Sequence, residues 1–517
     1  MNRADTDDRE HQAGDGKCNA PPRAWARSLP ARASALLVLV LLLAGMQSVG
    51  AVHARAEEAR QPNIVLVFMD NFGYGELGCY GGGITRGAPT PRIDKLAQAG
   101  LRLTNFNVEA QCTPSRAAIM TGRYAFRSGC GSVPLTDGLY GLTQWEVTMA
   151  EMLSDAGYAT GIFGKWHLGH TKGRFPTDQG FDEWYGIPNS TDEAAWTHQP
   201  EFNAAAKEGL SDYLIPEYIF SGKKGSDPTR VKVYDLNERP EMDRACIDHA
   251  KDFMKRQAQA GKPFFAFLPL TLTHLPVVAS KEFKGKSGNG KWGDVLMQID
   301  AYAGELLDLL EELKISDDTI FVFTADNGPE MSPGHQGWSG PWRGSYFTSL
   351  EGSLRVPFIL RWPGKVPAGR VSNEIVHEMD LYATFAKAAG GKIPQDRVID
   401  SLDQSDFFLG RSTKSQREGI VVYVGNDVHG VKWRNWKMLF KSLEHGRGTD
   451  NFVTHGFPQI FNLYEDPKEE YPFTKDSAGK LWVRWPMGEI LKAHAQSFQK
   501  DPAVKAGTPD PYVPPSK

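Results

Sequence analysis

The stretch "PNIVLVFMDNFGYGELGCYGG", residues 62–82, sets the fold class of this chain. Residues 64–69 form a near-continuous apolar run, which is typical of a strand buried on both faces of a parallel sheet. The run ends at Asp70 and Asn71, and glycines follow. Because α/β sheets place ligand sites at the carboxyl ends of their strands, we expect this Asp-Asn pair to face a site.

The same pattern occurs twice more. An apolar run at residues 264–270 leads toward His274, and another at residues 320–324 leads to Asp326 and Asn327. An Asp-Asn pair alone often caps a turn. Two such pairs at strand ends offer oxygen ligands without sulfur, which suits a hard cation such as Ca²⁺ or Mg²⁺. The predicted metal ligands are Asp70, Asn71, Asp326 and Asn327.

Helical segments alternate with these strands. Residues 91–100 begin with proline and end with glycine, the asymmetry expected of a helix. Residues 148–158 contain a glycine near their end, and residues 294–314 carry apolar side chains at helical spacing with acidic residues opposite them. This alternation predicts an α/β fold with a large mixed or parallel sheet covered by helices on both sides.

The last hundred residues have a different character. Residues 419–425, 430–442 and 458–470 resemble short strands separated by turn residues, which predicts a smaller antiparallel sheet. We therefore expect four parts: a leader, a main domain, a C-terminal subdomain and a loose Pro-rich tail. Their predicted bounds are 1–56, 57–412, 413–505 and 506–517.

The composition indicates a soluble globular protein. The chain has 517 residues, of which 41% are hydrophobic and 23% charged, and its formal net charge is −4. No long basic stretch is present, which argues against nucleic acid as a partner. The five cysteines, at positions 18, 79, 112, 130 and 246, are too few for a disulfide framework in a chain of this length. The fold must depend on its apolar core.

The N-terminal residues read as an export signal. A polar, Arg-bearing lead precedes the apolar run "SALLVLVLLLAG", and the small-residue segment "AVHARA" follows it. This pattern predicts a secretory signal cleaved after Ala54 or Ala56, and an uncleaved N-terminal anchor is the alternative. The run is short for a membrane span. We expect a secreted or periplasmic protein with no stable membrane span after cleavage.

Two further places hold candidate site residues. Lys165 and His167 lie two apart, and in an extended segment that spacing points both side chains to the same side, where they suit an anionic substrate. The alternative is a surface lysine beside a structural histidine. His274 is either a general acid at the sheet edge or a hydrogen-bonded core histidine.

The segment "CTPSR", residues 112–116, resembles the C-x-P-S-R motif of the sulfatase family. The segment "GYATGIFGKWHLG", residues 157–169, resembles the second motif of that family, and "TADNGPE" and "EGSLRVPFILRWPG" extend the similarity over residues 62–470. The resemblance implies an alkaline-phosphatase-like fold, a large mixed sheet flanked by helices with a small C-terminal antiparallel sheet. It also implies a sulfuric ester hydrolase of the arylsulfatase type.

In that family the motif cysteine, here Cys112, is oxidised by a maturation enzyme to the aldehyde Cα-formylglycine (3-oxoalanine). Its hydrate presents two hydroxyls, one that attacks sulfur and one that expels the sulfate. The resemblance further implies that Cys112 joins the ligands of the cation, with Ca²⁺ as first choice and Mg²⁺ as alternative. It assigns Arg116 to holding the hydrate, Lys165 and His167 to positioning hydrate and sulfate, His274 to protonating the leaving alcohol, and Asp326 to accepting the nucleophile's proton.

The sequence departs from the family pattern at two positions. Asn71 stands where a second aspartate is usual, which removes one negative charge from the metal site. Tyr346 stands where a sulfate-binding lysine is common, so Arg343, His335 or Tyr346 is expected to contact the substrate instead. A sulfate monoester carries one negative charge, against nearly two for a phosphate monoester, so fewer cations suffice.

These departures leave two other hypotheses open: a phosphodiester or phosphonate ester hydrolase of the same superfamily, and a catalytically weak protein that binds sulfated glycans. We expect the substrate to be a small-molecule or carbohydrate sulfate ester. Residues 188–239 form the least regular part of the middle of the chain, and such segments often set specificity. Trp184, Trp196 and Trp338 lie in polar stretches and are candidates for lining a cleft.

Overall fold

The structure is a computed structural model of the chain. It describes residues 61–134, 138–211, 214–331, 337–443, 451–473 and 475–514. The predicted leader and His335 lie outside the described residues. The chain from Gln61 onward forms one compact unit.

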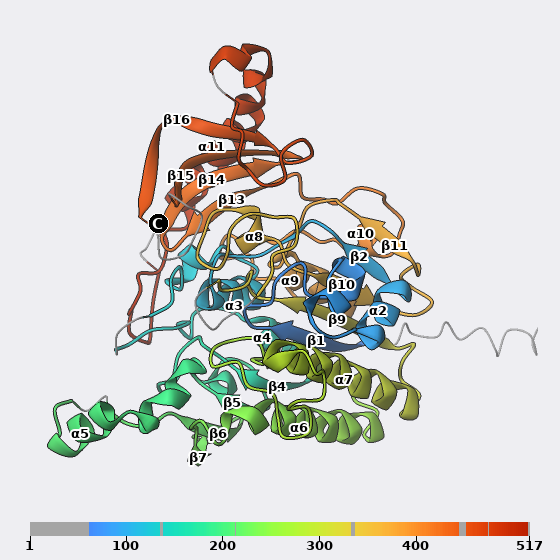
Figure 1. Ribbon diagram of the computed structural model, residues 1–517, viewed down its shortest axis with the longest axis vertical. Helices are drawn as coiled ribbons and strands as arrows, with labels where there is room; N and C mark the ends of the chain where they lie inside the picture. Colours follow the sequence, from blue (N-terminus) through green and yellow to red (C-terminus); the bar gives the residue numbers. More distant parts are fainter. Residues whose placement is uncertain are drawn as a thin grey trace, which may run out of the picture. The chain divides into compact units, whose positions relative to one another are not determined.

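A ten-stranded mixed sheet forms the centre of this unit (Figure 1), in the order β11-β2-β10-β9-β1-β8-β4-β5-β6-β7. The five strands from β9 to β5 are parallel, whereas β10, β6 and β7 introduce antiparallel pairs. The three predicted strands are confirmed and lie side by side at the centre. They are β1 (Asn63–Met69), β8 (Phe264–Leu270) and β9 (Thr319–Ala325), and each is buried along its whole length.

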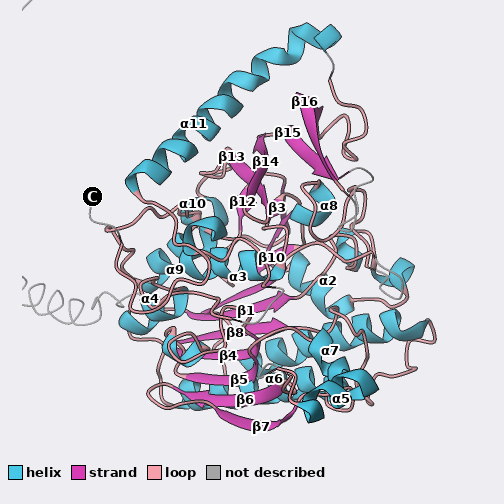
Figure 2. Cartoon of the chain, turned by 90° about the vertical axis from the view of Figure 1, so that its left-hand side faces the viewer, coloured by secondary structure: helices cyan, strands magenta, loops and turns pink. Residues whose placement is uncertain are grey.

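The predicted helices are also present. They are α2 (Pro91–Gln98), α4 (Met149–Asp155) and α7 (Gly290–Glu312), the last of which begins four residues before the predicted segment. Figure 2 shows helices on both sides of the sheet, with α2, α6 (Arg239–Gln259) and α7 on one side and α3 (Cys112–Thr121), α4 and α9 (Asp380–Ala389) on the other. A sheet buried on both faces explains why its central strands are apolar without alternation.

The remaining strands of the large sheet are β2 (Leu101–Leu103), β4 (Ala159–Lys165), β5 (Glu183–Ile187), β6 (Tyr218–Lys223), β7 (Thr229–Val233), β10 (Phe358–Arg361) and β11 (Arg370–Ser372), and β3 (Phe106–Asn107) pairs with β12 (Val376–His377). The other helices of this part are α5 (Pro200–Glu208), α8 (Glu351–Leu354), α10 (Ser405–Phe408) and the 3₁₀ segments η1 (Gly78–Tyr80), η2 (Gly83–Arg86), η3 (Ala125–Ser128), η4 (Pro176–Asp178) and η5 (Asp192–His198). Residues 188–239 are thus more regular than predicted, because they contain η5, α5, β6 and β7.

The C-terminal part contains the predicted antiparallel sheet. Its strands are β13 (Gly419–Val424), β14 (Asp427–Trp433), β15 (Trp436–Leu443) and β16 (Phe452–Asn462), paired in chain order, and η6 (Lys475–Val483) precedes a last helix, α11 (Arg484–Lys500). The division into domains at residues 412/413 stays a prediction. The tail beyond residue 505 contacts the main part of the chain, since Asp510 Oδ2 lies 3.2 Å from Arg174 Nη2.

A buried ionic network joins the small sheet to the main part. Glu351, at the start of α8, lies with its carboxylate 2.7 Å from Lys432 Nζ on β14 and 3.0 Å from Lys437 Nζ on β15. Arg355 also contacts the Glu351 carboxylate, and Glu469 lies 2.8 Å from Lys437. The side chains of all five residues are at most 2% exposed. Their charges are therefore stabilised by one another and not by water.

Two further observations concern the whole described part. Cys79, Cys112, Cys130 and Cys246 are all free thiols, as expected for a fold that depends on its core. Within the described ranges, none of the helices combines the length and the apolar character needed to span a bilayer.

Candidate active site

The two Asp-Asn pairs meet at the carboxyl edge of the central strands. Asp70 and Asn71 follow β1, and Asp326 and Asn327 follow its neighbour β9. The Asn71 N–H donates to Asp326 Oδ1 at 3.0 Å, and Asn327 Nδ2 donates to Asn71 Oδ1 at 2.6 Å. Asn71 has a left-handed backbone with φ of 54°, a conformation that asparagine tolerates better than most residues. The four side chains are fully buried.

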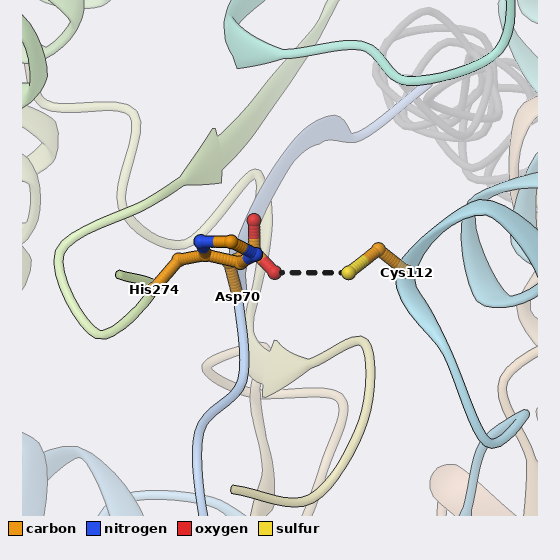
Figure 3. Close-up of side chains that lie close together, drawn as sticks. All are labelled: Asp70, Cys112 and His274. Carbon is orange, nitrogen blue, oxygen red and sulfur yellow. Dashed lines mark hydrogen bonds between the residues drawn. The ribbon is translucent and has the colours of Figure 1, made fainter. Parts of the chain in front are cut away.

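Cys112 lies against the first of these pairs. Its Sγ is 3.4 Å from Asp70 Oδ1 (Figure 3) and 3.9 Å from Asn71 Oδ1. Cys112 is the first residue of α3, so the thiol belongs to the first turn of that helix. Burial and the charge of Asp70 raise the pKa of the Cys112 thiol well above its ordinary value. The unmodified side chain is therefore a protonated thiol at neutral pH and a weak nucleophile.

Two buried cations balance the two carboxylates of the site. Arg116 Nη2 lies 2.8 Å from Asp326 Oδ2 and 3.3 Å from Asp70 Oδ2, and Lys165 Nζ lies 2.8 Å from Asp70 Oδ2. Arg116 Nη1 also donates to the Lys165 carbonyl at 2.6 Å, which ties α3 to the end of β4. The site therefore has little net charge before any ligand binds.

The two carboxyl groups titrate differently because of these cations. Burial alone would raise the pKa of Asp70, but Lys165, His274 and Arg116 hold it well below its ordinary value. Burial, together with the charge of Asp70, raises the pKa of Asp326 to about 7. Asp70 is thus the permanent anion, whereas Asp326 can gain or lose a proton near neutral pH.

His167 and His274 both lie close to the charged groups of the site. Burial, followed by the charge of Lys165, lowers the pKa of His167 and of His274, so both rings are neutral at neutral pH. The strand β4 ends at Lys165 and His167 has φ of 60°, so the extended geometry predicted for this segment does not reach His167. His167 instead contacts α3, the helix that begins at Cys112, through its carbonyl, which accepts from Thr113 Oγ1 at 3.1 Å.

Arg343 and Tyr346, the predicted replacements for the family lysine, take different positions. The Tyr346 hydroxyl accepts from Gln111 Nε2 at 3.1 Å, and Gln111 immediately precedes Cys112. Tyr346 therefore lies close to Cys112. The guanidinium of Arg343 donates to the Glu469 carbonyl at 2.6 Å, in the C-terminal part of the chain.

Three neighbours of the site were not predicted from the sequence. Ser190 Oγ lies 3.4 Å from both Lys165 Nζ and His274 Nε2, and Thr191 Oγ1 lies 2.7 Å from His274 Nδ1. The charge of Glu330 acts on His274 as well. Ser190 and Thr191 follow β5 in a polar loop that carries no signal of its own, whereas Glu330 could have been noticed because it lies four residues after Asp326.

The donor atoms fit a hard divalent cation. Ligand atoms of Asp70, Cys112 and His274 all lie within 4.8 Å of one another. Asn327 Oδ1 is buried, and no described residue donates a hydrogen bond to it. A buried acceptor without a donor is costly, and a cation among carboxylate and amide oxygens would satisfy it. His274 was not among the predicted metal ligands, whereas Asp326, which was, has its two oxygens engaged by Arg116 and Asn71.

Two protein-family models match most of the chain. The family model for sulfatases matches residues 62–391, and the model for the C-terminal region of aryl-sulfatase matches residues 415–516. The N-acetylgalactosamine-6-sulfatase of Canis lupus familiaris is 33% identical over 493 residues, covering 89% of this chain and 90% of the relative. Arylsulfatase A of Homo sapiens is 35% identical over 486 residues, covering 88% and 92%.

Among solved structures, the PsFucS1 sulfatase from Pseudoalteromonas sp. matches with a TM-score of 0.81 at 30% identity, covering 92% of this chain and 97% of that one. The similarity therefore includes both the large sheet and the small C-terminal sheet. The expectation drawn from residues 112–116 and 157–169 is confirmed: this protein belongs to the sulfatase family and is a sulfuric ester hydrolase.

Proposed function

We propose that the protein hydrolyses a sulfate monoester of a carbohydrate, with a formylglycine derived from Cys112 as nucleophile and a divalent cation as cofactor. The observation that carries the proposal is the position of Cys112, whose Sγ lies 3.4 Å from Asp70 Oδ1 at the start of α3. The name of the relative from Canis lupus familiaris, N-acetylgalactosamine-6-sulfatase, supports a sulfated sugar as substrate.

The burial of Cys112 supports a modified side chain. A protonated thiol in an acidic neighbourhood cannot attack the sulfur of an ester efficiently. Formylglycine would supply a hydrated aldehyde with one hydroxyl for attack and one for release of the sulfate. The free N–H groups and the dipole of the ten-residue helix α3 favour an anion at this point.

The cation would be held by Asp70, Asn71, Asp326, Asn327 and the modified Cys112, with Ca²⁺ as first choice and Mg²⁺ as alternative. When bound, it would polarise a sulfate oxygen as a Lewis acid. Asp70 provides the permanent charge for it. Arg116 and Lys165 already balance the charges of the two carboxylates. The positive charge of the bound cation would therefore attract the single negative charge of a sulfate monoester.

The protein's own groups would bind the substrate and move its protons. Lys165, 2.8 Å from Asp70, would contact the sulfate, and Arg116 would orient the nucleophile. Asp326, the second buried carboxyl group beside Cys112, would accept the nucleophile's proton.

His274 would protonate the leaving oxygen. Its Nδ1 lies 2.9 Å from the Leu275 carbonyl, which can only accept, so Nδ1 carries the proton of the neutral ring, and Nε2 must take up a proton before it can give one to the leaving oxygen. A bound sulfate would raise the pKa of the ring by its negative charge. His167 would position the sulfate, and Tyr346 would contact the substrate beside Gln111.

The proposal includes export and maturation. The N-terminal apolar run supports secretion or a periplasmic location. Oxidation of Cys112 would require a transient encounter with a formylglycine-generating enzyme.

The experiment is to express the chain with such an enzyme and to determine the mass of the tryptic peptide that spans residues 103–116. We expect the mass of formylglycine, reactivity with an aldehyde probe, and hydrolysis of 4-nitrophenyl sulfate. Cys112→Ala should abolish hydrolysis, and Cys130→Ala, at another buried free cysteine, is the matched control. Unmodified Cys112 in active protein would overturn the mechanism, and faster hydrolysis of an aryl phosphodiester would overturn sulfate as the preferred ester.

A further inference from the structure

A cavity lies between the end of β5 and β7. Its volume is about 420 Å³, within the range of roughly 300–1,000 Å³ found for small-molecule sites. Trp196, Tyr218 and Phe220 provide aromatic walls, and Asn189, Glu193 and Glu217 provide polar groups. We call it the Trp196 pocket.

The Trp196 pocket and the catalytic site share one wall, formed by residues 188–193. The Pro188 carbonyl accepts from the His167 N–H at 2.8 Å, and Ser190 Oγ lies 3.4 Å from His274 Nε2. Asn189 and Glu193, from the same short segment, line the pocket instead. The pocket therefore lies next to the His274 side of the site, where the leaving alcohol of the proposed reaction departs.

The aromatic walls are fixed in place. Phe220 stacks on the buried Trp184, with ring centroids 5.5 Å apart, and the Arg230 guanidinium lies 4.6 Å from the ring centre of Tyr218. Among the described aromatic residues, Trp196 makes a tilted ring contact with Phe202, at 5.6 Å, and it remains partly exposed. Trp196 is therefore the ring that can offer its face to a ligand.

The polar lining carries little net charge. Asn189 Nδ2 donates to Glu217 Oε2 at 2.7 Å, and the Tyr218 N–H donates to Glu217 Oε1 at 3.0 Å, so both carboxyl oxygens of Glu217 act as acceptors. Burial, with the neighbouring Glu217, raises the pKa of Glu193 to about 11, so Glu193 is neutral at neutral pH. The Arg230 guanidinium, which also lines the pocket, carries the charge opposite to that of the Glu217 carboxylate. The lining thus combines hydrogen-bonding groups with an aromatic face.

We propose that the Trp196 pocket binds an uncharged sugar ring of the leaving alcohol, with Trp196 as the stacking surface. This inference rests on the proposed function, because it assumes a sulfated carbohydrate as substrate. An aromatic face can stack on a sugar ring, and polar groups can form hydrogen bonds with its hydroxyls, so this lining suits a neutral sugar. A uronic acid or a second sulfate would find no net positive charge in this lining, because the Arg230 guanidinium is matched there by the Glu217 carboxylate.

The test compares two substrates in the formylglycine-bearing enzyme: N-acetylgalactosamine 6-sulfate and 4-nitrophenyl sulfate. In Trp196→Ala we expect kcat/KM for the sugar sulfate to fall about tenfold, through KM, and kcat/KM for the aryl sulfate to fall by no more than about threefold. Trp196→Phe keeps a ring and should recover most of the loss. Trp485→Ala, at a tryptophan of α11 that is 76% exposed, is the matched control and should change neither substrate.

A binding measurement separates the sugar from its charge. Galactose, N-acetylgalactosamine and glucuronic acid are tested as inhibitors of 4-nitrophenyl sulfate hydrolysis, and we expect glucuronic acid to inhibit at least about tenfold more weakly than the neutral sugars. Equal inhibition, or an equal loss on both substrates in Trp196→Ala with a native near-UV spectrum, would overturn the inference and leave the sulfatase mechanism intact. A wild type that carries formylglycine but hydrolyses neither ester would overturn the proposed function instead.

Discussion

Replacing Glu351 by glutamine should destabilise the junction between the two sheets. The Glu351 carboxylate is fully buried and lies 2.7 Å from Lys432 Nζ and 3.0 Å from Lys437 Nζ, with Arg355 also in contact. These cations hold the pKa of Glu351 well below its ordinary value despite its burial. Glutamine keeps the size of the side chain and removes only the charge, so Glu351→Gln tests the ionic network and not the packing.

The size of the effect follows from what each cation retains. Removing one partner of a buried ion pair costs about 3–5 kcal/mol, because the other charge is left uncompensated. Lys437 keeps Glu469 at 2.8 Å, and Lys432 keeps the side-chain oxygens of Asn105 and Asn107, each at 2.8 Å. We therefore expect the lower end of that range, a loss of about 3 kcal/mol in the free energy of unfolding.

The assay is urea unfolding followed by tryptophan fluorescence, with hydrogen exchange to locate the loss. Exchange should accelerate first in β14 and β15, which carry the two lysines. The matched control is Glu418→Gln, which breaks a solvent-exposed pair with Arg434 at 2.7 Å and should cost less than about 1 kcal/mol. Lys432→Met added to Glu351→Gln should restore part of the loss, because it removes a buried amine that has lost its carboxylate partner. A Glu351→Gln variant as stable as the control would refute the reasoning.

Three other predictions concern the site and its surroundings. Asn71→Asp should tighten Ca²⁺ binding roughly tenfold in calorimetry, because it restores a charged ligand; unchanged affinity would place Asn71 outside the metal site. Lys165→Met should lower kcat on 4-nitrophenyl sulfate about 10²–10³-fold by removing a cation 2.8 Å from Asp70, and a loss confined to KM would contradict a role in the transition state. Burial raises the pKa of Glu109 from its ordinary 4.5 to about 8, so the folded state holds a proton that the unfolded state loses, and the contribution of Glu109 to stability should decline as pH rises from 4.5 through 8. Glu109→Gln should flatten that part of the urea-midpoint profile, and an identical slope in the variant would contradict the assignment.

The central strands and the residues at their ends could be predicted because both signals are local. A run such as residues 64–69 shows burial on both faces by its composition, and Asp70 stands where the run stops. The roles of Cys112 and Arg116 needed the family resemblance, since a single cysteine in a turn carries no signal of its own.

The parts that could not be predicted depend on contacts between distant segments. Ser190 and Thr191 matter only because the loop after β5 passes His274, which follows β8. The prediction that Trp184 lines a cleft is wrong, because this residue is buried on β5 with 1% of its surface exposed. Trp196, predicted on the same grounds, does line a cavity. Their local sequences are similarly polar, and the difference comes from the side of the fold that each one faces. The ionic network around Glu351 likewise joins residues more than 80 positions apart.

The burial of Cys112 also has a consequence for the timing of events in the cell. With 1% of the residue exposed and Sγ enclosed by the ends of β1 and α3, no second enzyme can reach the thiol of the folded chain. Oxidation of Cys112 as proposed must therefore precede folding, while this segment is still an extended peptide. A chain that folds before oxidation keeps an unmodified Cys112. Adding the maturation enzyme afterwards would leave that chain inactive unless it were unfolded and refolded. The fraction of active molecules in a preparation would then report which of the two processes was faster during synthesis.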